Sequence, residues 1–259
     1  MPATASPSIN HWPDSACARA FWGQQEIPPY RRLLADTMAW LDPKPAETWL
    51  DLGCGCGQLT QGLWTKSQGT LAQLIASDCA AINERAIAKL RGNLRPAATE
   101  EQLSFVPLDF SNGLPLWHDA MFDGVVSGLA IQYAEHYCDE RRCWTTDAYD
   151  GLLREVFRVL RTGGRFVFSV NVPEPGWRRV AWQSIHGVFR SRHPGRYLKN
   201  SLRMIRYGRW LTREARRGRF HYLPIDIIIE KLRMAGFTDI KHRLTYACQA
   251  YLVRCLKPI

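Results

Sequence analysis

The residues that could do chemistry most directly stand in one short stretch, Asp-Leu-Gly-Cys-Gly-Cys-Gly, from Asp51 to Gly57. Glycines at alternate positions let the backbone adopt positive φ angles, and a ligand can approach the main chain without meeting a Cβ atom. The dinucleotide-binding fingerprint G-x-G-x-x-G is absent, because no glycine stands five residues after Gly53 or Gly55. The spacing D-x-G-x-G-x-G therefore predicts a ligand-binding turn of a different kind.

Cysteines are the other reactive residues in this turn. The chain has eight cysteines, scattered along its length, and two of them are Cys54 and Cys56. Disulfide frameworks belong to smaller secreted chains, so we expect reduced thiols in a cytosolic protein. His136, Cys138 and Cys143 resemble metal ligands, but no second pair completes a zinc pattern, and we expect no metal site. The two cysteines of the turn are interpreted as compact side chains.

Two further acidic residues follow apolar runs, Asp78 after residues 71–77 and Asp109 after residues 103–108. In a parallel sheet both carboxylates would lie at the carboxyl edge, where open α/β sheets bind ligands. An acid at a strand end can instead cap the helix that follows, and this alternative applies to each residue alone. A ligand site is favoured because the glycine turn and both acids fall in register.

The elements that must position these residues alternate between short apolar runs and helical patterns, which is typical of a parallel α/β sheet. Strands are expected at 48–52, 71–78, 103–109, 122–130 and 165–172. Helices are expected within 18–41, at 82–94, and from an N-cap at Asp147 to the Gly163–Gly164 pair, which should end that helix. One more helix before Gly236 and a hairpin from 238–244 and 246–256 would close the sheet.

Taken together, the glycine turn and the two acids resemble the class I S-adenosyl-L-methionine-dependent methyltransferases, in particular the quinone-methylase-like, or methyltransferase type 11, group. The resemblance covers roughly residues 45–172 and resumes over 222–258. It implies an α/β fold with a Rossmann-like seven-stranded, mostly parallel sheet, an antiparallel last strand and a basic helical insertion. The domains expected are a helical lead-in at 1–44, a cofactor-binding core at 45–173, a basic substrate-lid insertion at 174–222, and a helix and hairpin at 223–259 that complete the core.

The resemblance also implies how S-adenosyl-L-methionine would be held. Asp51 would lie near the ammonium group, Asp78 would accept from the ribose hydroxyls, and Asp109 would accept from the adenine amino group. The remaining implied cofactor contacts are Gly53, Cys54, Gly55, Gly57, Cys79, Phe110, Ser127 and Gln132.

The segment 127–137, Ser-Gly-Leu-Ala-Ile-Gln-Tyr-Ala-Glu-His-Tyr, would shape the acceptor pocket. It lacks the Asn/Asp-Pro-Pro-Tyr sequence of enzymes that methylate exocyclic amines, and it is more similar to small-molecule methylases. We therefore expect transfer to oxygen or carbon of a small, lipid-like or acidic acceptor. Alignment and exclusion of water supply much of the catalysis of such transfers. Where a base is needed, Tyr133 and His136 are the nearest candidates, with His186 and His221 as others.

Positive charge is concentrated in one segment. Residues 174–222 carry thirteen Lys and Arg against two Glu, in a chain whose net charge is +10. Arginines recur there every three or four residues, as on one face of a helix. This face is interpreted as a solvated surface, as a contact with an anionic membrane, or as a site for RNA or an acidic carrier protein.

The sequence also bounds the location and the class of function. No apolar run is long enough to span a membrane, and the N-terminus lacks the basic start and apolar stretch of a secretory signal. We expect a cytoplasmic protein, at most peripheral to a membrane. The alternatives to a small-molecule enzyme are an RNA- or membrane-binding module that retains the cofactor fold, and a methyltransferase that acts on RNA or a carrier protein. The intact glycine turn and both acids favour the enzyme.

Overall fold

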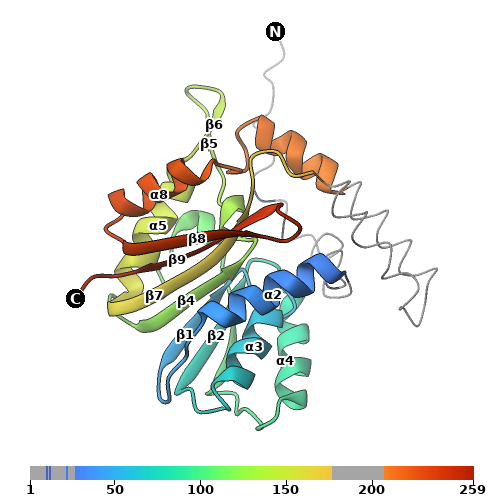
Figure 1. The fold of residues 1–259 in the computed structure, drawn as a ribbon, viewed down its shortest axis with the longest axis vertical. Coiled ribbons are helices and arrows are strands. Elements are labelled where there is room, and N and C mark those ends of the chain that lie inside the picture. Colours follow the sequence, from blue (N-terminus) through green and yellow to red (C-terminus); the bar gives the residue numbers. More distant parts are fainter. Residues whose placement is uncertain (1–9, 11, 13–21, 23–26, 177–206) are drawn as a thin grey trace, which may run out of the picture.

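A computed structural model describes residues 10, 12, 22, 27–176 and 207–259 (Figure 1). Much of the expected lead-in and most of the basic insertion therefore lie outside the described residues. The core is a seven-stranded sheet with the order β3-β2-β1-β4-β7-β9-β8. Its strands are β1 Thr48–Leu52, β2 Gln73–Asp78, β3 Leu103–Pro107, β4 Phe122–Gly128, β7 Leu160–Asn171, β8 Thr238–Thr245 and β9 Ala250–Leu256.

The predicted fold class is confirmed. Strands β1 to β4 and β7 pair in parallel, and β9 runs antiparallel to both of its neighbours, β7 and β8. The central strands read as continuous apolar runs because helices cover both faces of the sheet. Helices α5 (Asp147–Val159) and α8 (Ile225–Met234) lie on one face, and α3 (Gln58–Lys66) and α4 (Asn83–Asn93) on the other (Figure 1).

Most predicted elements differ from the structure by one or two residues at an end, and the larger differences are at the junction of α5 with β7 and at the start of β9. Helix α5 starts after its N-cap Thr146 and ends at Val159, and strand β7 begins at once and includes Gly163 and Gly164. The glycines belong to the sheet because Gly163 N–H donates to the carbonyl of Lys257, and Lys257 N–H donates to the carbonyl of Gly164. The last strand starts at Ala250 rather than 246, because residues 246–248 have positive φ and form the turn of the hairpin.

The described residues form further elements besides this sheet and its covering helices. Helix α2, Pro28–Trp40, confirms one helix of the expected 18–41 region. Strands β5 (His136–Cys138) and β6 (Cys143–Thr145) form a separate antiparallel hairpin that the sequence analysis did not predict. Residues 207–216 are helical. No helix among the described residues is both long and apolar enough to cross a membrane.

Candidate functional site

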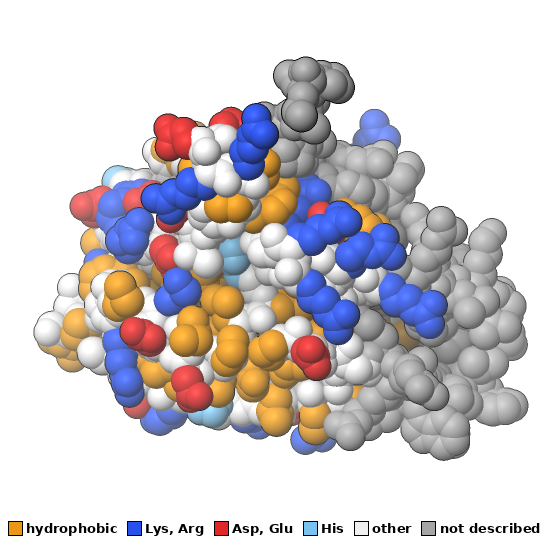
Figure 2. All heavy atoms as spheres, turned by 90° about the horizontal axis from the view of Figure 1, so that it is seen from above, with side chains coloured by type: hydrophobic (Ala, Val, Ile, Leu, Met, Phe, Trp, Pro, Cys, Tyr) orange, Lys and Arg blue, Asp and Glu red, His pale blue; other side chains and the backbone are white. Residues whose placement is uncertain are grey.

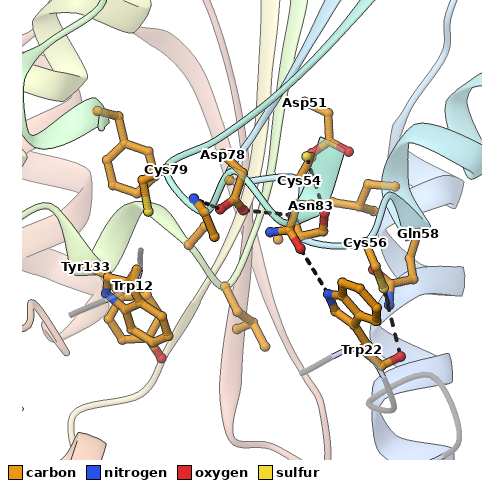
Figure 3. A pocket seen from close by; sticks show the side chains of 18 of the residues that line it. Trp12, Trp22, Asp51, Cys54, Cys56, Gln58, Asp78, Cys79, Asn83 and Tyr133 are labelled. Carbon is orange, nitrogen blue, oxygen red and sulfur yellow. Dashed lines mark hydrogen bonds between the residues drawn. The ribbon is translucent and has the colours of Figure 1, made fainter. Parts of the chain in front are cut away.

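A pocket opens at the carboxyl edge of the sheet, where the loops after β1, β2, β3 and β4 meet (Figure 3). It is lined from the glycine turn, from the ends of β2 and β7, and from three residues near the N-terminus. The lining residues include Asn10, Trp12, Trp22, Asp51, Gly53, Cys54, Gly55, Cys56, Asp78, Cys79, Asp109, Phe110, Tyr133, Asn171, Tyr207, Leu211 and Tyr246. Most of the cofactor residues predicted from the sequence therefore lie around one cavity.

Asp51 lines this pocket and is the next-to-last residue of strand β1. Its side chain is fully buried, and Thr60 Oγ1 donates a hydrogen bond to Oδ2 at 2.6 Å. Among the described residues, Oδ1 has no hydrogen-bond partner. Burial raises the pKa of this carboxyl to about 7, the hydrogen bond from Thr60 opposes that rise, and the nearby Asp78 adds to it. A buried carboxylate of this kind favours a cationic ligand.

Asp78 fastens the glycine turn to the end of β2. Its Oδ2 accepts the backbone N–H of Gly55 and its Oδ1 accepts that of Ala80, both at 2.9 Å. Burial raises the pKa of Asp78, while these backbone hydrogen bonds oppose the rise. Side-chain hydrogen bonds from Asn83 and Cys79 also oppose the rise in the pKa of Asp78.

Asp78 thus binds local main chain and lines the pocket, but it does not cap the next helix, because the N-cap of α4 is Ile82, without a side-chain cap. Asp109 does cap: it precedes the 3-10 helix Phe110–Asn112 and accepts the backbone N–H of Ser111.

The second and third glycines of the turn, Gly55 and Gly57, serve different purposes. Gly55 has φ +54°, and a Cβ at this position would meet nothing within 4 Å, because the residue faces the cavity. Gly57 has φ +85°, and a Cβ there would lie 2.6 Å from Ile87 Cδ1 on α4. Gly57 does not line the pocket: it is the N-cap of α3 and permits close packing of α3 against α4.

The cysteines of the site are free thiols. Cys54 is buried, whereas Cys56 and Cys79 are half-buried at the pocket wall. Gln58 Nε2 donates to Cys56 Sγ at 2.9 Å, and burial raises the pKa of Cys56 to about 11. Burial raises the pKa of Cys79 further, so that these groups stay protonated at neutral pH. Across the part of the chain that the structure describes, no three His, Cys, Asp or Glu side chains gather to hold a metal ion.

Two predicted cofactor residues, Ser127 and Gln132, do not line the pocket. Ser127 is buried and donates its hydroxyl to the carbonyl of Leu52 at 2.7 Å, joining β4 to β1. Gln132 is also buried; its Nε2 donates to the carbonyl of Leu129 and its Oε1 accepts the backbone N–H of Asn171. Neither side chain lines the pocket, and both brace the strands that do.

The two catalytic candidates lie in different places. Tyr133 lines the pocket, its hydroxyl is 3.1 Å from that of Tyr222, and burial raises its pKa to about 12. His136 lies outside the pocket on β5, where its side chain is 48% exposed and contacts Thr145 Oγ1 at 2.8 Å. The β5–β6 hairpin turns this histidine away from the site.

Of the two other histidines considered as bases, His221 lies among the described residues and offers no base. His221 is buried, its Nε2 lies 2.7 Å from the carbonyl oxygen of Ala134, and burial lowers its pKa to about 4. It is therefore a neutral packing group and does not line the pocket. His186 lies outside the described residues.

Aromatic rings form one side of the pocket. The ring of Trp12 lies 4.5 Å from that of Tyr133 and 6.4 Å from that of Tyr207. Phe220 packs behind them, 5.0 Å from Tyr133. Trp22 lies on the opposite side, where its indole N–H donates to Asn83 Oδ1 at 2.9 Å (Figure 3). This arrangement gives the cavity an apolar half next to its acidic half.

The helical residues 207–216 link that aromatic wall to the basic surface. Tyr207 and Leu211 face the pocket, whereas Arg209, Arg213 and Arg216 are exposed. Figure 2 shows Lys and Arg side chains gathered on this view of the molecule, beside the undescribed region. The described end of the basic insertion is thus amphipathic, with an aromatic inner side and an arginine-rich outer side.

Several lining residues were missed by the sequence analysis. Asn171 is a polar residue at the carboxyl end of a strand, the same signal that identified Asp78, and it could have been found. Asn10, Trp12 and Trp22 stand in a segment without periodicity or motif. Only the tertiary structure brings them to the pocket.

Comparison with known proteins agrees with this geometry. Residues 50–168 match the methyltransferase domain family. The ubiquinone/menaquinone biosynthesis C-methyltransferase of Acidiphilium cryptum is 29% identical over 178 residues, which cover 65% of this chain and 64% of that relative. The matched region thus spans less than two thirds of the relative's length.

Two solved structures share the fold. One is a chain from the complex between a methyltransferase activator of Haloferax volcanii and a methyltransferase, with a TM-score of 0.64 and 16% identity over 97% of this chain and 98% of that one. The other is an S-adenosyl-L-methionine-dependent methyltransferase structure from Methanococcus maripaludis, with a TM-score of 0.60 and 15% identity over 97% of both chains. Residues 50–168 thus match a methyltransferase domain, and the curated relative and the shared fold agree with the resemblance to the class I S-adenosyl-L-methionine-dependent methyltransferases.

Proposed function

We propose that this chain transfers a methyl group from S-adenosyl-L-methionine to oxygen or carbon of a small, lipid-like or acidic acceptor. The observation that carries the proposal is Asp51 Oδ1, a buried carboxylate oxygen without a hydrogen-bond partner among the described residues. In the same turn, Gly55 leaves open space where any other residue would place a Cβ. A buried anion beside open backbone fits the ammonium group of the cofactor.

The other acids extend this assignment along the pocket. Asp78 would accept from the ribose hydroxyls, and Asp109 from the adenine amino group. Cys79 and Phe110 line the cavity on the Asp109 side and would contact the adenine ring. The residues present therefore suit the cofactor that the family implies.

The side chains of this protein need to contribute little to the bond-making step itself. The bound cofactor supplies an activated methyl group on a sulfonium. The pocket residues would exclude water and hold the acceptor in line with that methyl group. Tyr133 keeps its proton at neutral pH, because burial raises its pKa to about 12, so we assign it hydrogen bonding to the acceptor rather than proton removal. His136 is not part of the proposed machinery, because it lies outside the pocket.

The apolar half of the pocket supports a lipid-like acceptor. Trp12, Tyr133, Tyr207 and Leu211 offer flat apolar surfaces next to the acidic half. The relative from Acidiphilium cryptum is named for C-methylation in quinone biosynthesis, which agrees with an acceptor of this character. We further propose that the protein works in the cytoplasm, at most at the surface of a membrane.

Calorimetry with S-adenosyl-L-methionine tests the proposal. Asp51→Ala and Asp78→Ala should each weaken binding about 100-fold, because loss of one partner of a buried charged contact costs about 2–5 kcal/mol. Asp226→Ala, at an exposed position on α8, is the matched control and should bind as the wild type does. Unchanged affinity in a folded Asp51→Ala variant would contradict the assignment.

The rival function is a module that binds RNA or a membrane and only retains the fold. It predicts no affinity for S-adenosyl-L-methionine, together with a tight, salt-sensitive RNA gel shift. The same wild-type preparation can be measured for both, so the two functions are distinguished directly.

A further inference from the structure

We propose that Asn10, which stands 40 residues before the matched family region, is a cofactor-positioning residue that orients the carboxylate of Asp109. Asn10 and Asp109 both line the pocket. The proposal rests on the proposed function and adds to it a residue outside the methyltransferase domain that acts on the adenine end of the site.

The first support is a closed ring of four hydrogen bonds. Asn10 Nδ2 donates to Asp109 Oδ2, and Asn10 N–H donates to Glu135 Oε1 at 2.8 Å. Glu135 N–H in turn donates to Ser111 Oγ at 3.1 Å. Ser111 N–H then donates to Asp109 Oδ1 at 3.0 Å, which closes the ring. Both oxygens of Asp109 are therefore held by donors, one from its own loop and one from Asn10.

The second support is the way in which Asn10 itself is fixed. Its φ is +59°, in the left-handed region that asparagine tolerates better than most other residues. Its Oδ1 accepts the backbone N–H of Trp12 at 3.1 Å. Its other anchor, Glu135, is buried and forms an ion pair with Arg219, whose guanidinium lies 4.9 Å from the ring centre of Trp144. The carboxamide is thus held from several sides rather than lying loosely in the cavity.

The chemical consequence concerns the base of the nucleoside. An ionised carboxylate only accepts hydrogen bonds, so it favours an amino group and disfavours a carbonyl oxygen at the same position. A carboxylate held by two donors keeps its remaining lone pairs in one direction, whereas a free one can rotate away. Asn10 would therefore strengthen binding of an adenine nucleoside and, more specifically, discrimination against a hypoxanthine nucleoside.

The test measures binding of S-adenosylhomocysteine and S-inosylhomocysteine by calorimetry, with no turnover required. Asn10→Gly keeps the left-handed backbone accessible and removes the carboxamide, and Asn10→Asp keeps the shape but places a second carboxylate against Asp109. Both should weaken binding of the adenosyl compound about tenfold and lower its preference over the inosyl compound, in line with loss of a hydrogen bond to a charged group. Asn93→Gly, at an exposed position on α4, is the matched control and should change neither.

Each outcome is decisive. Lower preference in both Asn10 variants, with the melting temperature unchanged, supports the proposal. An unchanged preference, or tighter binding of the adenosyl compound by Asn10→Gly, overturns it, because Asn10 would then be a structural residue or a competitor of the base. Failure of the wild-type chain to bind either compound would refute the proposed function and this proposal with it.

Discussion

The buried carboxyl of Asp51 lowers the stability of the ligand-free protein, whereas its negative charge would favour binding of a cation. Its burial without a full set of donors raises its pKa from 3.8 to about 7, so the folded chain holds a proton that the unfolded chain releases between these values. Because the folded state binds more protons across that window, stability falls as the pH rises from about 4 to about 7. An ion pair with a bound ammonium would offset this loss of stability. The free-energy cost of burying the ionised carboxylate is thereby linked to the proposed role of Asp51.

Asp51→Asn should therefore stabilise the ligand-free protein at pH 8. The shift of about 3 pKa units corresponds to at most about 4 kcal/mol, and the amide can still accept the hydrogen bond from Thr60. Urea unfolding at pH 8 should show this gain, the gain should shrink toward pH 5, and the variant should lose affinity for S-adenosyl-L-methionine. A variant less stable than the wild type at pH 8 would contradict the role assigned to burial.

At the scale of elements, the turn between β1 and α3 contains one glycine that allows helix packing, Gly57, and one that lines the pocket, Gly55. Gly57→Ala places a Cβ 2.6 Å from Ile87 Cδ1 in a left-handed residue, so it should lower stability by about 1–3 kcal/mol. Gly55→Ala also strains the backbone, but its Cβ meets only open space in the pocket. It should therefore cost less stability and more cofactor affinity. Unfolding and calorimetry on both variants test this, and equal losses in both measurements would contradict it.

Prediction of these elements from sequence succeeded where the signal is local. Apolar runs ended by Asp78 and Asp109 identified β2 and β3, because burial on both faces of a parallel sheet requires such runs. The end of α5 was misplaced because Gly163 and Gly164 serve the sheet through Lys257, almost one hundred residues later. The position of His136 outside the pocket was not predictable for a related reason, since the short β5–β6 pairing that carries it has no periodic pattern.

At the scale of the whole molecule, the residues that line the pocket besides the acids come from distant parts of the chain. Trp12 reaches Tyr133, and Asn10 reaches Asp109, only because the fold returns the N-terminal residues to the carboxyl edge of the sheet. Long-range contacts of this kind leave no mark on local composition, so the sequence indicated most residues of the acidic half of the pocket but few of its aromatic half. The helical residues 207–216 fit the same pattern, because the sequence showed their arginines but not the inward direction of Tyr207.

The arrangement of that helical segment favours an anionic membrane as the partner of the basic surface. Its outer side presents Arg209, Arg213 and Arg216, while its inner side lines the apolar half of the pocket, so an acceptor dissolved in lipid would enter beside it. Changing all three arginines to Glu should weaken binding to vesicles of anionic lipid on the order of 100-fold, at about 1 kcal/mol for each arginine. Sedimentation with anionic and with neutral vesicles measures this, and wild-type binding should decline as salt increases.

The matched control reverses charge on another exposed helix, with Arg85→Glu and Lys89→Glu on α4. Figure 1 shows α4 at the lower end of the molecule and the helical residues 207–216 at its upper end, so vesicle binding should remain close to that of the wild type. Equal losses per reversed charge, with three charges reversed in one variant and two in the other, would mean that net charge alone drives adsorption. A tight RNA gel shift without vesicle binding would instead assign the basic surface to nucleic acid. Only a loss confined to the triple arginine variant agrees with a membrane contact that delivers the acceptor to the aromatic half of the pocket.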